Sequence, residues 1–133
     1  MRFMSMVKSS ESYRLGPPPQ ALMDAIAEMG QEMAKTGTMV DMGGLLPTAM
    51  GAYRVRQSGG KLTVTDGPFS EAKEVIGGYA VFDVASKEEA MALTMQFMEL
   101  HLKHWPEWEG ESEVRQMFEG NGCPDAPPCS PQA

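Results

Sequence analysis

The sequence is poor in the residues on which several large classes of protein depend. Its 133 residues include two histidines and two cysteines, and eighteen acidic side chains outnumber eleven basic ones, giving a net charge of −7. A chain of this charge, without a lysine and arginine run, is not expected to bind the phosphate backbone of nucleic acids directly or an anionic membrane surface. No apolar stretch approaches the roughly 20 residues that cross a bilayer.

The sequence also lacks a secretory signal, a zinc-binding ligand set and the motifs that bind common cofactors. The first ten residues, "MRFMSMVKSS", lack the apolar run and cleavage site of a secretory signal, so we expect a cytoplasmic protein. Cys123 and Cys129 both stand in the last segment, where a disulfide would close only a short loop, and we interpret them as incidental thiols. Two cysteines without a nearby histidine also fall short of the four ligands of a zinc site. Because nucleotide-binding and nucleophile motifs are missing, we predict no metal and no organic cofactor.

Apolar spacing divides the chain into a β-α-β unit, a hairpin and a second β-α-β unit. Strands are predicted at residues 2–8, 38–44, 52–57, 61–65, 78–85 and 112–119, and helices at residues 20–36 and from the N-cap Ser86 to just before Pro106. Two such units with right-handed crossovers predict an α+β, ferredoxin-like sheet with both helices on one face. We expect residues 1–119 to form one domain and residues 120–133 a disordered tail.

The predicted sheet has apolar residues on both of its faces. In strands 2–8 and 78–85 both alternating sets are apolar, although helices cover only one side. Exposed apolar surface of this extent marks an interface, so we predict a homodimer, a dimeric α+β barrel in which two sheets pack face to face. The thirteen methionines, many at helical spacing, are interpreted as core filler, with a methionine-lined ligand pocket as the alternative.

The stretch "TDGPFSEAKEVIGGY", residues 65–79, places an acid, a turn and an aromatic between two strands. Asp66 either caps the turn by accepting backbone N–H bonds or serves as a base or ligand anchor, for which burial must raise its pKa. Phe69 is expected to fill the core beneath the turn. Glu71, Lys73 and Glu74 are predicted to share one helical turn as a solvated charged face.

Four more side chains are candidates for a site. Arg54 and Arg56 share one face of the hairpin and are either surface charges or a clamp for a carboxylate. Tyr79 is either a core residue or a hydroxyl donor to a pocket. His101 and His104 are helical neighbours for which no third metal ligand is evident, so we interpret them as surface residues of the last turn.

The same region resembles the DGPF-type branch of the YCII-related proteins. The resemblance is carried by "DGPF" at residues 66–69, then Glu71, Lys73 and Glu74, and the pair Gly77 and Gly78. It implies a dimeric α+β barrel, and for some members an association with extracytoplasmic-function sigma factors. It also implies an enzymatic role that uses a histidine and an aspartate. The aspartate maps to Asp66, whereas the first strand, first helix and hairpin contain no histidine to match.

Together these observations predict a dimeric domain that binds a small molecule and transfers protons. The pocket is expected between the sheet and the helices, with Asp66 as the catalytic residue at its rim. Its predicted ligand-binding residues are Arg54, Arg56, Phe69 and Tyr79. The alternative is a non-enzymatic regulatory protein that acts with a sigma factor.

Overall fold

The computed structural model describes residues 1–11 and 16–119, so the predicted tail and its two cysteines lie outside the described residues. The elements are β1 (Arg2–Ser9), α1 (Gln20–Lys35), β2 (Met39–Gly44), β3 (Tyr53–Ser58), β4 (Lys61–Asp66), β5 (Val75–Asp83), α2 (Lys87–His104) and β6 (Gly110–Gln116). Their order confirms the predicted pair of β-α-β units separated by a hairpin. Within the described residues, the structure has no helix both long and apolar enough to cross a membrane.

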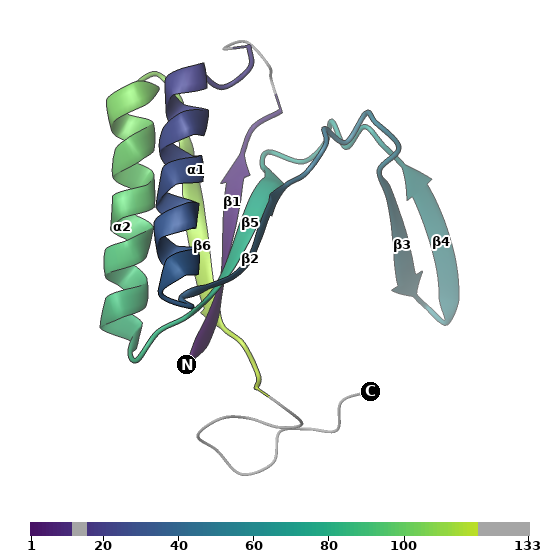
Figure 1. The fold of residues 1–133 in the computed structure, drawn as a ribbon. Helices are drawn as coiled ribbons and strands as arrows, with labels where there is room; N and C mark the ends of the chain where they lie inside the picture. The colour runs from purple at the N-terminus through teal and green to yellow at the C-terminus, as the bar shows by residue number, and fades with distance from the viewer. Residues whose placement is uncertain (12–15, 120–133) are drawn as a thin grey trace.

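Four strands form one antiparallel sheet in the order β2-β5-β1-β6. Both helices lie against the same face of this sheet, as Figure 1 shows. The fold is therefore α+β and ferredoxin-like, as predicted. In its centre, Phe3 pairs with Phe82 and Ser5 pairs with Ala80, which fixes which side chains turn toward the helices.

The core lies between the sheet and the two helices. It is built on Phe3, Met33, Phe82 and Ala90, each at most 8% exposed. The rings of Phe3 and Phe82 are stacked with their centroids 6.2 Å apart. Met29 also packs against this cluster, so some of the methionines do fill the core.

Helix α2 begins with the capping box that the sequence predicts. Ser86 Oγ accepts a hydrogen bond from the Glu89 backbone N–H at 3.1 Å, and Glu89 Oε2 accepts one from the Ala85 N–H at 2.9 Å. The reciprocal bond thus reaches one residue further back than in the standard box. Capping satisfies N–H groups that the first turn leaves without helical partners.

The predicted helical turn after the motif is wrong. Residues 70–74 form no helix, and β5 starts at Val75, three residues earlier than predicted, because Ser9 already pairs with it. Glu71 instead reaches back to form an ion pair with Arg54. Glu71 therefore pairs with the hairpin from the loop before β5 and does not belong to a helix.

Strands β3 and β4 form a separate two-stranded hairpin, here called the arm (residues 53–66). Figure 1 shows it projecting away from the layer of sheet and helices. Gly59 and Gly60 turn the chain with φ values of 56° and 75°, which side chains disfavour. One face of the arm is an apolar ladder, defined by Tyr53, Val55, Leu62 and Val64, whose exposed fractions are 66%, 56%, 72% and 64%.

Candidate functional site

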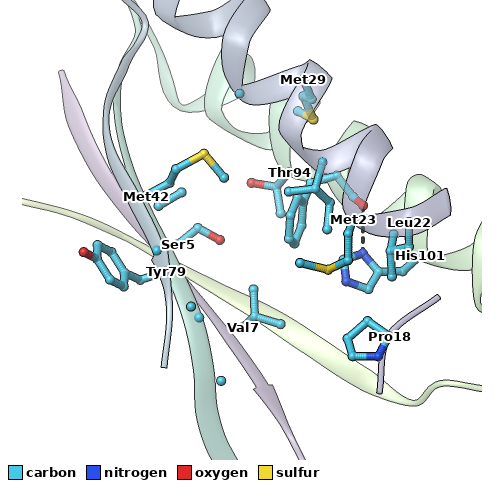
Figure 2. A pocket seen from close by; sticks show the side chains of 18 of the residues that line it. Ser5, Val7, Pro18, Leu22, Met23, Met29, Met42, Tyr79, Thr94 and His101 are labelled. Carbon is cyan, nitrogen blue, oxygen red and sulfur yellow. Dashed lines mark hydrogen bonds between the residues drawn. The ribbon is translucent and has the colours of Figure 1, made fainter. Parts of the chain in front are cut away.

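A cavity of about 600 Å³ lies between the sheet and the helices. Figure 2 shows side chains of both layers directed into it. Its lining includes Ser5 and Val7 of β1, Leu22, Met23, Met29 and Met33 of α1, Thr94, Phe97 and His101 of α2, and Trp105 and Trp108 beyond it. Among the described residues that line it, none is Asp, Glu, Lys or Arg. The wall is therefore largely apolar, as is usual for small-molecule pockets.

Glycines of two neighbouring strands border the cavity. Gly43 and Gly44 of β2 and Gly77 and Gly78 of β5 all line the cavity, and Gly44 pairs directly with Gly78. Where large side chains would normally fill the gap beneath a helix, this part of the sheet presents only backbone. Gly44 and Gly78 thus leave this part of the wall without side chains, whereas the Cβ position of Gly43 faces the Tyr79 ring.

His101 is the buried titratable side chain of the cavity wall, with 7% of its surface exposed. Its Nδ1 lies 3.0 Å from the Phe97 carbonyl oxygen, which can only accept, so Nδ1 carries the proton. Nε2 is therefore left as an acceptor, because a neutral imidazole holds one proton. Burial lowers the pKa of His101, an effect that the bond to Phe97 partly offsets. The interpretation of His101 as a surface residue is thus wrong.

A helical stripe in the sequence could have identified this burial. Ala90, Thr94, Phe97 and His101 recur every three or four residues along α2, and Ala90 and His101 are buried. The spacing of His101 from His104 does not show this stripe, because His104 does not belong to it. Packing then fixes the ring, whose centroid lies 4.7 Å from that of Phe97 and 4.6 Å from that of Trp108.

The lowered pKa of His101 predicts a pH-dependent stability. As pH falls below the ordinary histidine value of about 6.5, the unfolded chain binds a proton that the folded chain resists. The free energy of unfolding should therefore fall with pH, by at most about 1.4 kcal/mol per pH unit, until the folded-state pKa is reached. Urea denaturation at several pH values should show this slope in the wild type and a smaller one in His101→Phe. Loss of the slope in His104→Phe instead would contradict the assignment.

Two hydroxyl groups complete the polar part of the cavity. Ser5 is 7% exposed, and Figure 2 shows its hydroxyl directed into the space below the helices. The Ser5 hydroxyl forms no hydrogen bond with another described residue, and Ser5 lines the cavity. Thr94 Oγ1 donates to the Ala90 carbonyl at 2.9 Å and keeps its lone pairs.

The DGPF turn is held by the segment that precedes the arm. The Gly67 N–H donates to the Ala52 carbonyl at 2.7 Å, and the Phe69 N–H donates to Thr48 Oγ1 at 3.1 Å. Asp66 is exposed at the end of β4, and its carboxylate is the acceptor in neither bond. Thr48 and Ala52 therefore accept these two bonds of the turn, in place of the capping that was one of the two roles predicted for Asp66.

Arg54 and Phe69 lie together beside this turn. Phe69 is buried, as predicted, and the Arg54 guanidinium carbon lies 3.7 Å from the centroid of its ring. Both line a second hollow that runs along residues 45–52 toward Lys8 and Ile76. Arg56 is exposed on the same face of the arm as Arg54, and neither Arg56 nor Asp66 borders this hollow or the cavity.

Tyr79 contributes to the cavity wall, but its hydroxyl points elsewhere. Figure 2 shows its ring directed away from His101. The hydroxyl donates to Asp41 Oδ2 at 3.1 Å, and this bond raises the pKa of Tyr79. The structure thus gathers Ser5, Thr94 and His101 at the cavity and places the predicted residues Arg54 and Phe69 at the turn.

Comparison with known proteins supports the family resemblance. A family model described as the YCII-related domain matches residues 1–97, a segment that ends before His101. An uncharacterised protein of Rhizobium meliloti (strain 1021) is 32% identical over 72 residues, which are 54% of this chain and 57% of that protein. The match thus spans little more than half of either chain.

Proposed function

The chain belongs to the YCII-related family, and we propose that it binds a small molecule in the cavity between the sheet and the helices. The observation that carries this proposal is a space of about 600 Å³ with an apolar wall and few polar groups. Volumes of about 300–1,000 Å³ with such a lining are typical of ligand sites. The chemistry of the wall thus favours a small organic molecule over a macromolecule.

Proton transfer within this site is assigned to the cavity histidine. Burial lowers the pKa of His101 and so favours the neutral imidazole, and with Nδ1 bonded to the Phe97 carbonyl its Nε2 is an acceptor, as a general base requires. The catalytic role predicted for Asp66 stays a prediction and needs a ligand that reaches the exposed end of β4. The predicted ligand contact of Arg54 and Phe69 likewise applies to the second hollow.

Filling the cavity should weaken the binding of an apolar probe. We expect N-phenyl-1-naphthylamine to gain fluorescence with the wild type and to bind Val7→Trp about tenfold more weakly or worse, a loss of about 1.4 kcal/mol. The reason is that Val7 lines the cavity, so an indole there occupies the space of the probe. Circular dichroism checks that the variant folds, and Val7→Phe is a smaller replacement.

The matched control is Val55→Trp, which places the same indole on the exposed apolar ladder of the arm. Val55 is 56% exposed and does not line the cavity, so this variant should bind the probe like the wild type. Weaker binding by Val55→Trp with unchanged binding by Val7→Trp would place the probe on the arm and contradict the proposal.

The second candidate is the regulatory function, in which the chain contacts a protein such as an extracytoplasmic-function sigma factor. The arm favours it, because its apolar ladder is more than half exposed along its length. Contiguous exposed apolar surface is typical of contact with another protein. Co-purification of a sigma factor with the wild type but not with Leu62→Lys would support this function.

The homodimer is likewise part of the proposal. Met4 and Met6 lie on the sheet face opposite the helices, where they are half-buried. Tyr79 of β5 is the cross-strand partner of Met6. Where β1 meets β6 the same face carries charge, and Lys8 Nζ of β1 lies 3.0 Å from Glu113 Oε1 of β6. A dimer that packs this face should therefore be apolar at its centre and ionic at one edge, and light scattering at working concentration tests whether it forms.

A further inference from the structure

Two polar atoms that face the cavity without a partner define what a ligand must offer. Nδ1 of His101 is committed to the Phe97 carbonyl, and neither Nε2 of His101 nor Oγ of Ser5 forms a hydrogen bond with another described residue. Figure 2 shows the two side chains on opposite sides of the space. Nε2 of a neutral imidazole with a protonated Nδ1 only accepts, whereas a serine hydroxyl accepts or donates. The histidine therefore selects for a donor.

The rest of the wall favours an uncharged aromatic body. An ion placed among these side chains would lose its hydration without compensation, since no described lining residue is charged. Methionine sulfur and aromatic rings both make favourable contacts with aromatic ligands. The wall supplies both kinds, the methionines Met23, Met29 and Met42 and the aromatic residues Phe97, Trp105 and Trp108.

We propose that the cavity selects an uncharged aromatic molecule that donates one N–H or O–H hydrogen bond to Nε2 of His101. This inference rests on the proposed function, because it names the ligand class of the same cavity. The Ser5 hydroxyl, on the opposite wall, binds a second polar group where the ligand has one. His101 then positions the donor end of the ligand, and the methionines adapt to the remaining rings.

Indole and indene test this directly, because they share a shape and differ in one N–H. Their affinities are measured by NMR titration of the full-length protein, read on the methyl signals of the methionines. We expect indole to bind about three- to tenfold more tightly than indene, the value of one hydrogen bond. The 15N signal of His101 Nε2 should move with indole and stay in place with indene.

Variants separate the inference from the proposed function. In His101→Phe the two probes should bind equally, whereas His104→Phe, changed one turn along the same helix, should keep the preference for indole. Equal binding of both probes to the wild type overturns the inference and leaves the proposed function standing. Binding of neither probe overturns both. A preference for indole that persists in His101→Phe also overturns the inference, and if that variant does not fold, the 15N signal of the wild type decides.

Discussion

Replacement of Phe3 by alanine is expected to lower the free energy of unfolding by about 3–5 kcal/mol. Phe3 is 5% exposed, stacks on Phe82 and belongs to the cluster that joins the central strand to both helices. The loss combines the transfer of the ring out of water with the void that it leaves, which the sheet closes only in part. Because domains of this size are stable by about 5–15 kcal/mol, the variant should be close to unfolding.

The chain offers a matched control in Phe118. This ring is 56% exposed beyond the end of β6, so Phe118→Ala should change the free energy of unfolding by less than about 0.5 kcal/mol. Both variants are compared by urea denaturation, followed by tryptophan fluorescence and far-ultraviolet circular dichroism. Equal losses in the two variants would show that Phe3 is not the centre of the core.

Substitution of Gly67 by alanine is expected to cost about 1–3 kcal/mol and to disorder the base of the arm. A Cβ at this position would overlap the carbonyl oxygen of Thr48 and press on that of Ala52. Both neighbours are backbone atoms, so the turn must open to relieve the overlap. Opening it weakens the bond from the Gly67 N–H to Ala52 and the bond from the Phe69 N–H to Thr48.

Gly77→Ala is the control, because a Cβ at Gly77 meets nothing within 4 Å. Alanine there should leave the stability unchanged or raise it, since glycine in a strand has more conformational freedom to lose on folding. The measurements are denaturation and amide hydrogen exchange of residues 53–66. A Gly67→Ala variant as stable as the wild type, with unchanged exchange in the arm, would refute the steric role of this glycine.

Local sequence signals were sufficient for the architecture. The alternation of Tyr53 and Val55 with Arg54 and Arg56 predicted a strand, and Gly59-Gly60 predicted its turn. The capping box at Ser86 located the start of α2. Each of these signals depends on residues that are close in the sequence, so each can be recognised without the tertiary structure. The charged residues after the motif predicted a helical turn that does not form. The ion pair of Glu71 with Arg54 and the pairing of Val75 with Ser9 of β1 outweigh the helical pattern.

Local sequence signals do not predict the position of the cavity. It depends on Gly44 of β2 lying beside Gly78 of β5, a pairing between residues 34 positions apart, and on the helices above leaving that space open. His101 reaches the cavity only because α2 packs with that face inward. The place of Asp66 in the motif makes it a candidate, but the motif turn bonds to Thr48 and Ala52, and Asp66 does not line the cavity.

Thr48, Ala52 and the DGPF turn form a hydrogen-bonded unit, here called the clasp, at the base of the arm. It fixes the direction in which the arm leaves the body, through bonds that involve no residue of the cavity. The proposed protein contact of the arm and the proposed ligand site of the cavity therefore use separate sets of residues. We therefore expect a substitution at Thr48 to affect the arm and spare the cavity, and a substitution at His101 to affect the cavity and spare the arm.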